Sequence, residues 1–563
     1  MNNKIIKSFM AVAMAASLFG CSAATKTTAT TAAASATPTD SVTRKTAFGD
    51  VTGTDTGKSL VWYGIPYGAA PEGKLRWSAP TDPTAWSTAL DCTAAKDPAM
   101  QYVTDSKTGV TTSKGTDDCL NLDVYSTANA SNLPVLVYIH GGNNQSGNSQ
   151  EIEGNEIVVK DNCVYVSLSY RLGLLGFNCL PALQTEKDST GNYTMLDIAK
   201  ALDWIKQNIA QFGGNPDNIT VSGFSAGGRD VMAMLISPIF KDKFQKAVAF
   251  SGGMTTADEE MSAEKIATLM APLAIEDGKA SDTDSAKKFL LGTGSDVKEY
   301  LYSIDSSRLA AAVGNANIRM SAFPHLYTDG VVLPTEGFDT KTYNSVPLLM
   351  LTGSTEFSFF NNFDSSFSKL DSSVKDAAVA FGNTYGSDMY RIFNAEMSAE
   401  KMSDSYKSNI YIAQVDFGSA ASKTQVPLFG AFHGIFVPML ADTNGYTTVF
   451  DFANAAGYQA MATKFNAYLS NFLKSGDPNG TDLPKWNNWT KSAKVSQVFD
   501  ADSSAAIIEN KDVSTTYADI MDRMDADTSI DEETKKFVIE NSMNGRWFSS
   551  ELAKRYSTPD LWK

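Results

Sequence analysis

Short apolar runs alternate with amphipathic stretches through the middle of the chain. Five apolar runs have the length of buried strands, at residues 133–140, 163–170, 219–224, 246–251 and 346–351. Between the second and third runs, apolar residues recur every three or four positions, which predicts a helix over 194–212. This alternation predicts an α/β fold with a large, mostly parallel central sheet flanked by helices on both faces.

The remaining segments differ from this pattern. Residues 254–320 and 357–425 carry few strand signals, so we expect helical excursions over the sheet. An apolar stripe over 461–472 precedes Gly476 and Pro478, and it predicts a helix that ends there.

The C-terminal residues after about 510 are polar and acidic, with a helix expected around 533–556. No Gly-, Pro- or Ser-rich linker divides residues 46–510. We therefore predict one large domain over 46–563, with the acidic residues after about 510 as a C-terminal extension.

The N-terminus has the pattern of an export signal. Lys4 and Lys7 precede an apolar run over 8–20 that is too short to cross a bilayer, which predicts a signal peptide over 1–20. The following Leu18-Phe19-Gly20-Cys21 resembles a bacterial lipobox, in which Cys21 would be lipidated. A Thr/Ala-rich tether is expected over 21–45. We predict an exported protein anchored in the cell envelope through Cys21, the alternative being a soluble periplasmic or secreted form.

The chain has a net charge of −16, which argues against nucleic acid as a partner because phosphate binding requires clustered Lys and Arg. Contact with membrane is expected only through the N-terminal lipid. Four cysteines remain after Cys21, and their spacing leaves three possible pairings open. None forms a C-x-x-C pair, so we expect no zinc site.

A candidate nucleophile lies between a predicted strand and a predicted helix. Residues 223–227 read Gly-Phe-Ser-Ala-Gly, which matches G-x-S-x-G with Ser225 at its centre. The apolar strand over 219–224 and the apolar run that follows Gly227 supply the strand–turn–helix context that this motif requires. Ser225 is therefore the predicted nucleophile.

A second glycine-rich turn follows the strand over 133–140. His140-Gly141-Gly142-Asn143 lies where backbone N–H groups could face a developing oxyanion. We predict that Gly142 and Asn143, together with Ala226 after the nucleophile, supply the oxyanion donors. His140 is expected to hold this loop rather than to react.

Chain order selects the other two catalytic residues, because α/β sites of this kind run serine, then acid, then histidine. His140 precedes Ser225, so it does not fit this order. His325 would need an acid within residues 226–324, where no carboxylate directly follows a clear strand. His433 is thus the predicted base, and Glu356, just after the strand over 346–351, the predicted acid. The competitor Asp329 fits an Asp-Gly turn instead, and Glu336 follows no strand. This chemistry requires no metal or cofactor.

Several longer motifs resemble those of the type-B carboxylesterases, the cholinesterase-like branch of the α/β-hydrolases. The resemblance extends from about residue 46 to about 510, and its main segments are YGIPYG at 63–68, LRW at 75–77, DDCLNLDVY at 117–125, SYRLGLLGF at 169–177 and the long run at 201–228. The resemblance implies a serine carboxylic-ester hydrolase that acts through an acyl-enzyme on small or medium esters. The alternatives are an inactive cholinesterase-like surface binding protein, and an amide or carbamate hydrolase with the same triad.

The resemblance also implies roles for individual residues. It implies the catalytic roles already given to Ser225, Glu356 and His433, and the oxyanion roles of Gly142, Asn143 and Ala226. It further implies a disulfide between Cys92 and Cys119, and an ion pair between Arg76 and Asp117.

The chain departs from the family pattern at several positions. Asn143 replaces a loop glycine, and Phe436 stands where the family often has an acid. The segment before Glu356 is shorter than usual, and Arg229 is bulkier than the small residues common there. We expect Arg229 either to protrude near the site or to have a structural role.

Overall fold

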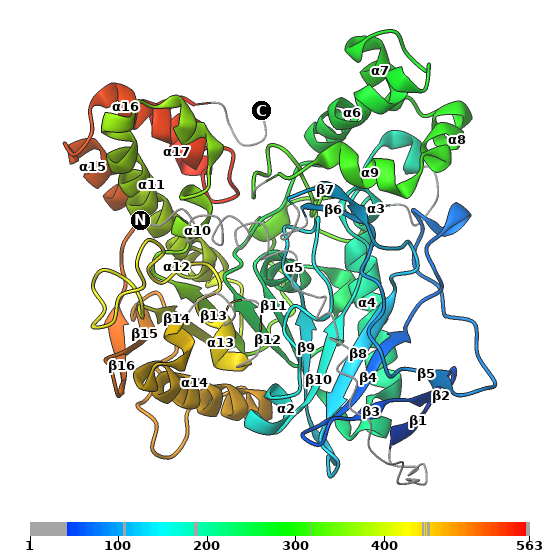
Figure 1. The fold of residues 1–563 in the computed structure, drawn as a ribbon, viewed down its shortest axis with the longest axis horizontal. Helices are drawn as coiled ribbons and strands as arrows, with labels where there is room; N and C mark the ends of the chain where they lie inside the picture. Colours follow the sequence, from blue (N-terminus) through cyan, green and yellow to red (C-terminus); the bar gives the residue numbers. More distant parts are fainter. Residues whose placement is uncertain are drawn as a thin grey trace, which may run out of the picture.

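The computed structural model describes residues 42–104, 109–184, 190–316, 318–441, 444, 446 and 451–558. An 11-stranded sheet forms its centre, in the order β16-β15-β14-β13-β12-β11-β9-β10-β8-β4-β3 (Figure 1). Its strands are β3 (Thr54–Asp55), β4 (Leu60–Pro66), β8 (Asn121–Ser126), β9 (Leu133–Ile139), β10 (Val164–Leu168), β11 (Gly214–Phe224), β12 (Lys246–Phe250), β13 (Leu348–Gly353), β14 (Ile410–Val415), β15 (Val495–Ala501) and β16 (Ala506–Asp512). Pairing is parallel from β10 through β15 and antiparallel at both edges, which confirms the predicted mostly parallel sheet.

Alternate side chains of the central strands enter two separate apolar cores. In β9, Val135, Val137 and Ile139 belong to one core, whereas Leu136 and Tyr138 belong to the other. Successive side chains of a strand point to opposite faces, so a strand covered on both sides must be apolar throughout. This explains why continuous apolar runs in the sequence mark the positions of β9 to β13.

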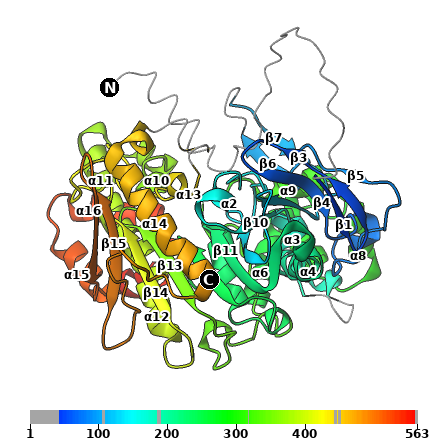
Figure 2. The same ribbon diagram turned by 90° about the horizontal axis from the view of Figure 1, so that it is seen from below.

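Helices cover both faces of the sheet and one of its ends. Figure 2 shows α14 lying along one side of the sheet, while α3, α4 and α6 lie in the other half of that view. The helices are α2 (Ile157–Lys160), α3 (Gly173–Gly176), α4 (Tyr193–Asn208), α5 (Ala226–Met234), α6 (Glu259–Glu276), α7 (Thr283–Leu290), α8 (Ser295–Ser303), α9 (Ser306–Val313), α10 (Ser358–Asn361), α11 (Ser372–Asn394), α12 (Glu396–Met402), α13 (Val437–Leu440), α14 (Ala456–Ser475), α15 (Tyr517–Ala526), α16 (Glu532–Val538) and α17 (Ser550–Tyr556). In the described part of the chain, no helix combines the length and apolar character needed to cross a bilayer.

Two groups of helices stand above the same end of the sheet, with α6 to α9 on one side and α11 with α15 to α17 on the other (Figure 1). Helices α6 to α9 fall in the predicted helical excursion over 254–320 and α10 to α12 in that over 357–425, whereas α15 to α17 belong to the C-terminal extension. The second range also contains β14, a six-residue strand that the sequence analysis missed. Its apolar run covers only residues 410–413 before the polar Gln414 and lies in a range expected to be helical, so it gave no separate signal.

The C-terminal extension packs more closely than its polar composition suggested. Ile520, Met524, Val538 and Leu552 are fully buried against α11, in a third apolar cluster. The expected helix around 533–556 is divided into α16, a π-helical turn at Ile539–Met543, and α17. The extension is therefore an integral part of the fold.

Other small strands lie outside the main sheet: β1 (Thr43–Thr46), β2 (Gly49–Thr52) and β5 (Leu90–Asp91) form one sheet, and β6 (Gln101–Thr104) and β7 (Thr111–Lys114) form a hairpin. Because β1 begins at Thr43, the folded part starts slightly earlier than predicted. The predicted signal peptide, the lipidation residue Cys21 and most of the tether lie outside the described residues.

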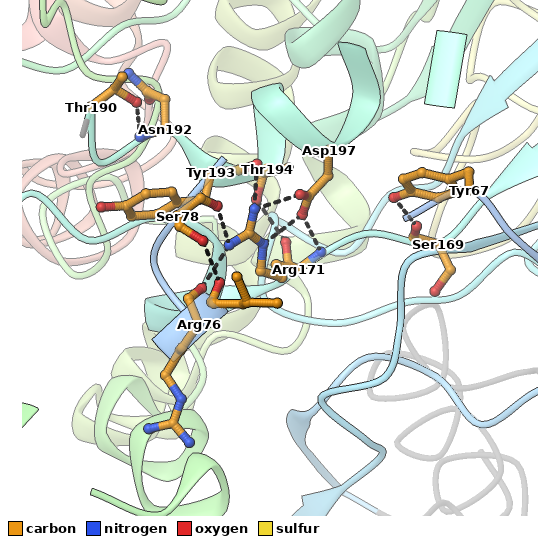
Figure 3. A network of polar contacts seen from close by, with 11 residues as sticks. Tyr67, Arg76, Ser78, Ser169, Arg171, Thr190, Asn192, Tyr193, Thr194 and Asp197 are labelled. Atoms are coloured by element: carbon orange, nitrogen blue, oxygen red, sulfur yellow. Dashed lines mark hydrogen bonds and ion pairs between the residues drawn. The ribbon is translucent and has the colours of Figure 1, made fainter. Parts of the chain in front are cut away.

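A buried ion pair ties the loop after β10 to α4 (Figure 3). The Arg171 guanidinium donates to Asp197 Oδ2 at 2.8 Å and Oδ1 at 2.5 Å, and to the carbonyls of Arg76 and Ser78 at 2.6 and 3.1 Å. Both side chains of the pair are almost completely buried. The implied pair of Arg76 with Asp117 is also present, at a longer 3.5 Å.

The implied disulfide between Cys92 and Cys119 is wrong, because both residues are free thiols in the structure. Cys92 follows β5, where its backbone pairs with Thr52 and Tyr63, and burial raises the pKa of its thiol to about 12. Cys119 lies beside the Arg76–Asp117 pair instead, and burial raises the pKa of its thiol well above the ordinary value. Each buried thiol thus has its own charged neighbours, Lys96 and Asp91 for Cys92 and Asp197 and Arg171 for Cys119.

Candidate active site

Loops at the carboxyl ends of β9, β11, β13 and β14 meet above the sheet, and they carry the residues selected from the sequence. Ser225 follows β11 at φ 56° and ψ −113°, a backbone conformation that is rare for a residue with a side chain. Its N–H donates to the Phe250 carbonyl at 2.9 Å. A Cβ added to Gly223 would lie 2.3 Å from the backbone of Gly227, so only glycine permits this sharp turn.

Glu356 and His433 form a direct pair. His433 Nδ1 lies 2.5 Å from Glu356 Oε2. The other carboxylate oxygen accepts from the Ser251 hydroxyl at 2.6 Å, the Thr352 hydroxyl at 3.1 Å and the Gly353 N–H at 2.6 Å. Glu356 has no exposed surface. Four donors therefore fix this carboxylate and direct one oxygen at the imidazole.

The imidazole of His433 is enclosed by aromatic rings. The Phe224 ring lies 4.6 Å and the Phe360 ring 5.0 Å from the imidazole centre. Tyr390, from α11, brings its hydroxyl to 3.4 Å from His433 Nδ1. These contacts restrict the ring to the orientation in which Nδ1 faces Glu356.

The loop after β9 presents backbone N–H groups beside Ser225. Gly142 and Asn143 both have positive φ, at 97° and 56°. Among the described residues, no acceptor is hydrogen-bonded to the N–H groups of Gly142, Asn143 or Ala226. Ala226 is the first residue of α5, where a free N–H is normal and the helix dipole favours negative charge. The arrangement suits a bound oxyanion.

His140 has the structural role expected for it. Its Nδ1 lies 2.8 Å from the Gly141 carbonyl oxygen, and its ring stacks on Tyr170 at 4.3 Å. Burial lowers the pKa of His140 to about 4, so it is neutral at physiological pH. A neutral ring held in this way supports the loop without titrating near neutrality.

A cavity of about 130 Å³ opens onto the loop residues, Ser225 and His433. Its wall includes the aromatic residues Phe224, Phe359, Phe360 and Tyr446. Among the described lining residues there is no Lys or Arg, and the one carboxylate belongs to Glu151. Glu151 Oε2 accepts from the Gly141 N–H and the Tyr138 hydroxyl, both at 2.8 Å, and burial raises the pKa of Glu151 to about 7.

The competing acid and base are engaged elsewhere. Asp329 Oδ1 accepts from three backbone N–H groups, those of Val331, Val332 and Leu333, at 2.8–3.0 Å. This is the turn-capping role predicted for Asp329. His325 contacts Arg229 in the interior and does not line the cavity.

Three residues near the site had not been selected from the sequence, namely Ser251, Glu151 and Tyr390. Ser251 is the last residue of the strand predicted over 246–251 and directly follows β12, at the same sheet end as Ser225, and this position was a usable signal. Glu151 and Tyr390 come from a loop and from the middle of α11, and no local pattern distinguishes them.

The sheet topology, the strained serine after β11 and the helix that begins behind it define an α/β-hydrolase. Two solved structures of PNB esterase share this fold. One has a TM-score of 0.64 and 25% identity, covering 83% of this chain and 97% of the other. The second has a TM-score of 0.67 and 24% identity, covering 85% and 99%.

Sequence comparison identifies the family. The Carboxylesterase family matches residues 40–383, more than half of the chain, and the protein belongs to this family. Para-nitrobenzyl esterase of Bacillus subtilis is 37% identical over 42% of this chain, an alignment that spans about half (48%) of that relative. Acylcarnitine hydrolase of Rattus norvegicus and cocaine esterase of Homo sapiens are each 28% identical over 75% of this chain and 80% of their own length.

Proposed function

We propose that the protein is a serine hydrolase that cleaves carboxylic esters through a covalent acyl-enzyme. The observation that carries this proposal is that His433, paired with the buried Glu356, lines the same cavity as Ser225. Family membership supports ester hydrolysis as the reaction, and the triad assigns the residues that perform it.

In the proposed acylation step, His433 Nε2 accepts the Ser225 proton as Oγ attacks the ester carbonyl. Glu356 keeps the second ring proton on Nδ1 and stabilises the imidazolium that forms. The tetrahedral oxyanion is bound by the N–H groups of Gly142, Asn143 and Ala226, and each such donor contributes about 3 kcal/mol. Collapse of this intermediate expels the alcohol, which takes its proton from His433.

In the proposed deacylation step, His433 removes a proton from water, and the resulting hydroxide attacks the acyl-enzyme. The same donors bind the second oxyanion, and His433 returns the proton to Ser225 as the acid leaves. No other group is needed for either half-reaction.

We further propose small or medium-sized carboxylic esters as substrates. The cavity is small, aromatic rings form part of its wall, and its described lining residues offer no Lys or Arg to a substrate carboxylate. The relatives named for para-nitrobenzyl esters, acylcarnitines and cocaine all act on carboxylic esters according to those names. Ester hydrolysis is therefore the reaction to test first.

The experiment combines labelling with kinetics. A fluorophosphonate probe should modify Ser225, identified by peptide mass spectrometry, and Ser225→Ala should lose about 10³-fold or more in kcat on p-nitrophenyl acetate. His433→Ala should be inactive while His325→Ala loses far less activity, because of these two histidines only His433 lines the cavity. Activity of Ser225→Ala within tenfold of the wild type would refute the proposal.

A further inference from the structure

Arg229 is a buried cation that has no ion pair. It lies one turn into α5 after Ser225, has no exposed surface, and has no carboxylate within salt-bridge distance among the described residues. Burial lowers the pKa of Arg229 to about 10, so the guanidinium is still charged at neutral pH. A buried charge whose hydrogen bonds all go to neutral groups is costly, which indicates that its position serves a purpose.

The direct contacts of the guanidinium are with neutral groups, and the buried carboxylate of Asp230, the next residue in the chain, interacts with it over a longer distance. Its Nη2 donates to Asn143 Oδ1 at 2.9 Å. Its Nη1 lies 2.9 Å from His325 Nε2 and 3.3 Å from Met320 Sδ. The indole ring of Trp547 lies 4.0 Å from the guanidinium carbon, which is cation–π geometry.

The protonation of His325 follows from its contacts. Its Nδ1 lies 3.0 Å from the Phe323 carbonyl oxygen, an acceptor, so Nδ1 carries the proton. Burial lowers the pKa of His325 well below its ordinary value, which leaves Nε2 unprotonated. Nε2 can then accept from Arg229 Nη1, and the hydrogen bond fixes the plane of the guanidinium.

Trp547 belongs to the C-terminal extension and is itself held firmly. Its neighbour Arg546 donates to Asp364 Oδ2 at 2.7 Å, on the loop that follows α10. Trp547 also packs on Tyr390 at 5.2 Å, and Tyr390 reaches His433. The extension thus contacts both the oxyanion side and the histidine side of the site.

We propose that Arg229, clamped by Trp547 of the C-terminal extension, is the positioning residue that holds Asn143 in its oxyanion-binding conformation. The inference rests on the proposed function. Asn143 has a φ of 56°, a conformation that residues other than glycine adopt at some cost. Its amide oxygen is fixed by the hydrogen bond from Arg229. Without that hydrogen bond the loop can relax, and the Asn143 N–H would no longer point at the oxyanion.

The test is a double-mutant cycle between Arg229 and Asn143, measured with the full-length protein and p-nitrophenyl acetate. Arg229→Met should lower kcat about 10- to 100-fold with little change in KM, since an oxyanion donor acts in the transition state. Asn143→Gly removes the amide that Arg229 holds and tolerates positive φ. In the Asn143→Gly background, Arg229→Met should therefore cost less than about threefold.

A second readout reports on the oxyanion alone. The affinity of a trifluoromethyl ketone, which forms a tetrahedral adduct, should fall in parallel with kcat/KM in Arg229→Met. Trp547→Leu should show the same pattern with a smaller loss, and it provides an independent variant if Arg229→Met does not fold. Leu552→Ala removes buried packing from the same extension and should lower Tm while leaving kcat unchanged.

The outcomes separate the two proposals. Equal losses from Arg229→Met in both backgrounds, or wild-type kcat for both Arg229→Met and Trp547→Leu, would overturn the positioning role while Ser225→Ala stays inactive. If Ser225→Ala is active, the proposed function itself fails.

Discussion

Replacing Glu356 with glutamine tests the catalytic pair most directly. Glu356 Oε1 accepts from two hydroxyls and from the Gly353 N–H, and this last donor is part of the backbone and cannot turn away. In Glu356→Gln the amide oxygen must therefore occupy the Oε1 position. The amide NH₂ then faces His433 Nδ1, where the carboxylate oxygen had been.

This arrangement forces the wrong tautomer on His433. With a donor opposite, Nδ1 must present its lone pair, so the ring proton moves to Nε2, which then cannot accept the proton of Ser225. The negative charge of Glu356, which stabilises the imidazolium, is lost as well. Comparable changes in other triads cost about 10⁴ in kcat, which corresponds to about 5 kcal/mol of transition-state stabilisation.

The assay compares kcat for ester hydrolysis with Tm for Glu356→Gln and Asp329→Asn. Glu356→Gln should lose about 10⁴-fold in kcat and keep a near-native circular dichroism spectrum. Asp329→Asn should lower Tm with little effect on kcat, because Asp329 caps a turn with three backbone donors. The reverse pattern would make Asp329 the catalytic acid and refute the reasoning.

Three further predictions concern stability and location. Asp197→Asn should destabilise the fold by about 3–5 kcal/mol in denaturant titration, because it leaves Arg171 buried without its partner; a loss below about 1 kcal/mol would contradict this. Burial raises the pKa of Asp161 to about 8, so its contribution to stability is present at acid pH and is lost as pH rises toward 8. Tm should fall less between pH 5 and pH 8 in Asp161→Asn than in the wild type. An equal fall in both proteins would show that Asp161 does not cause the pH dependence. Cys21→Ser should release the protein from the membrane fraction; unchanged fractionation would favour the soluble exported form.

The strands β9 to β13 could be predicted because their apolar side chains are buried on both faces of the sheet, whereas the edge strands β3 and β16 are partly exposed and, like β4, β8 and β15, were not predicted. Where a strand has only a short apolar run, or a contact depends on tertiary packing, the sequence does not predict it. The apolar run of β14 covers only residues 410–413 before Gln414 and lies in a range expected to be helical, so it did not indicate a strand. The contacts of Trp547 with Arg229 and Tyr390 depend on how the C-terminal extension folds back, and no local periodicity encodes that return.

The cysteines show the limit of a resemblance. Cys92 and Cys119 occupy positions at which the family motifs imply a bridge, yet both are buried free thiols in separate surroundings. A motif fixes the local backbone, whereas a disulfide also requires two Cβ atoms about 4 Å apart and correctly directed. That second condition depends on tertiary packing and cannot be obtained from spacing.

Two departures from the family pattern explain each other once the structure is known. Asn143 replaces a loop glycine, and Arg229 replaces a small residue after the nucleophile, 86 positions away in the chain. Separately, each change is unfavourable: one places a side chain at positive φ, and the other buries a charge. Together they form a hydrogen bond of 2.9 Å beside the nucleophile, so the arginine supplies the support that the asparagine needs. Replacing only Arg229 or only Asn143 with the family's small residue should therefore destabilise the fold more than replacing both residues together.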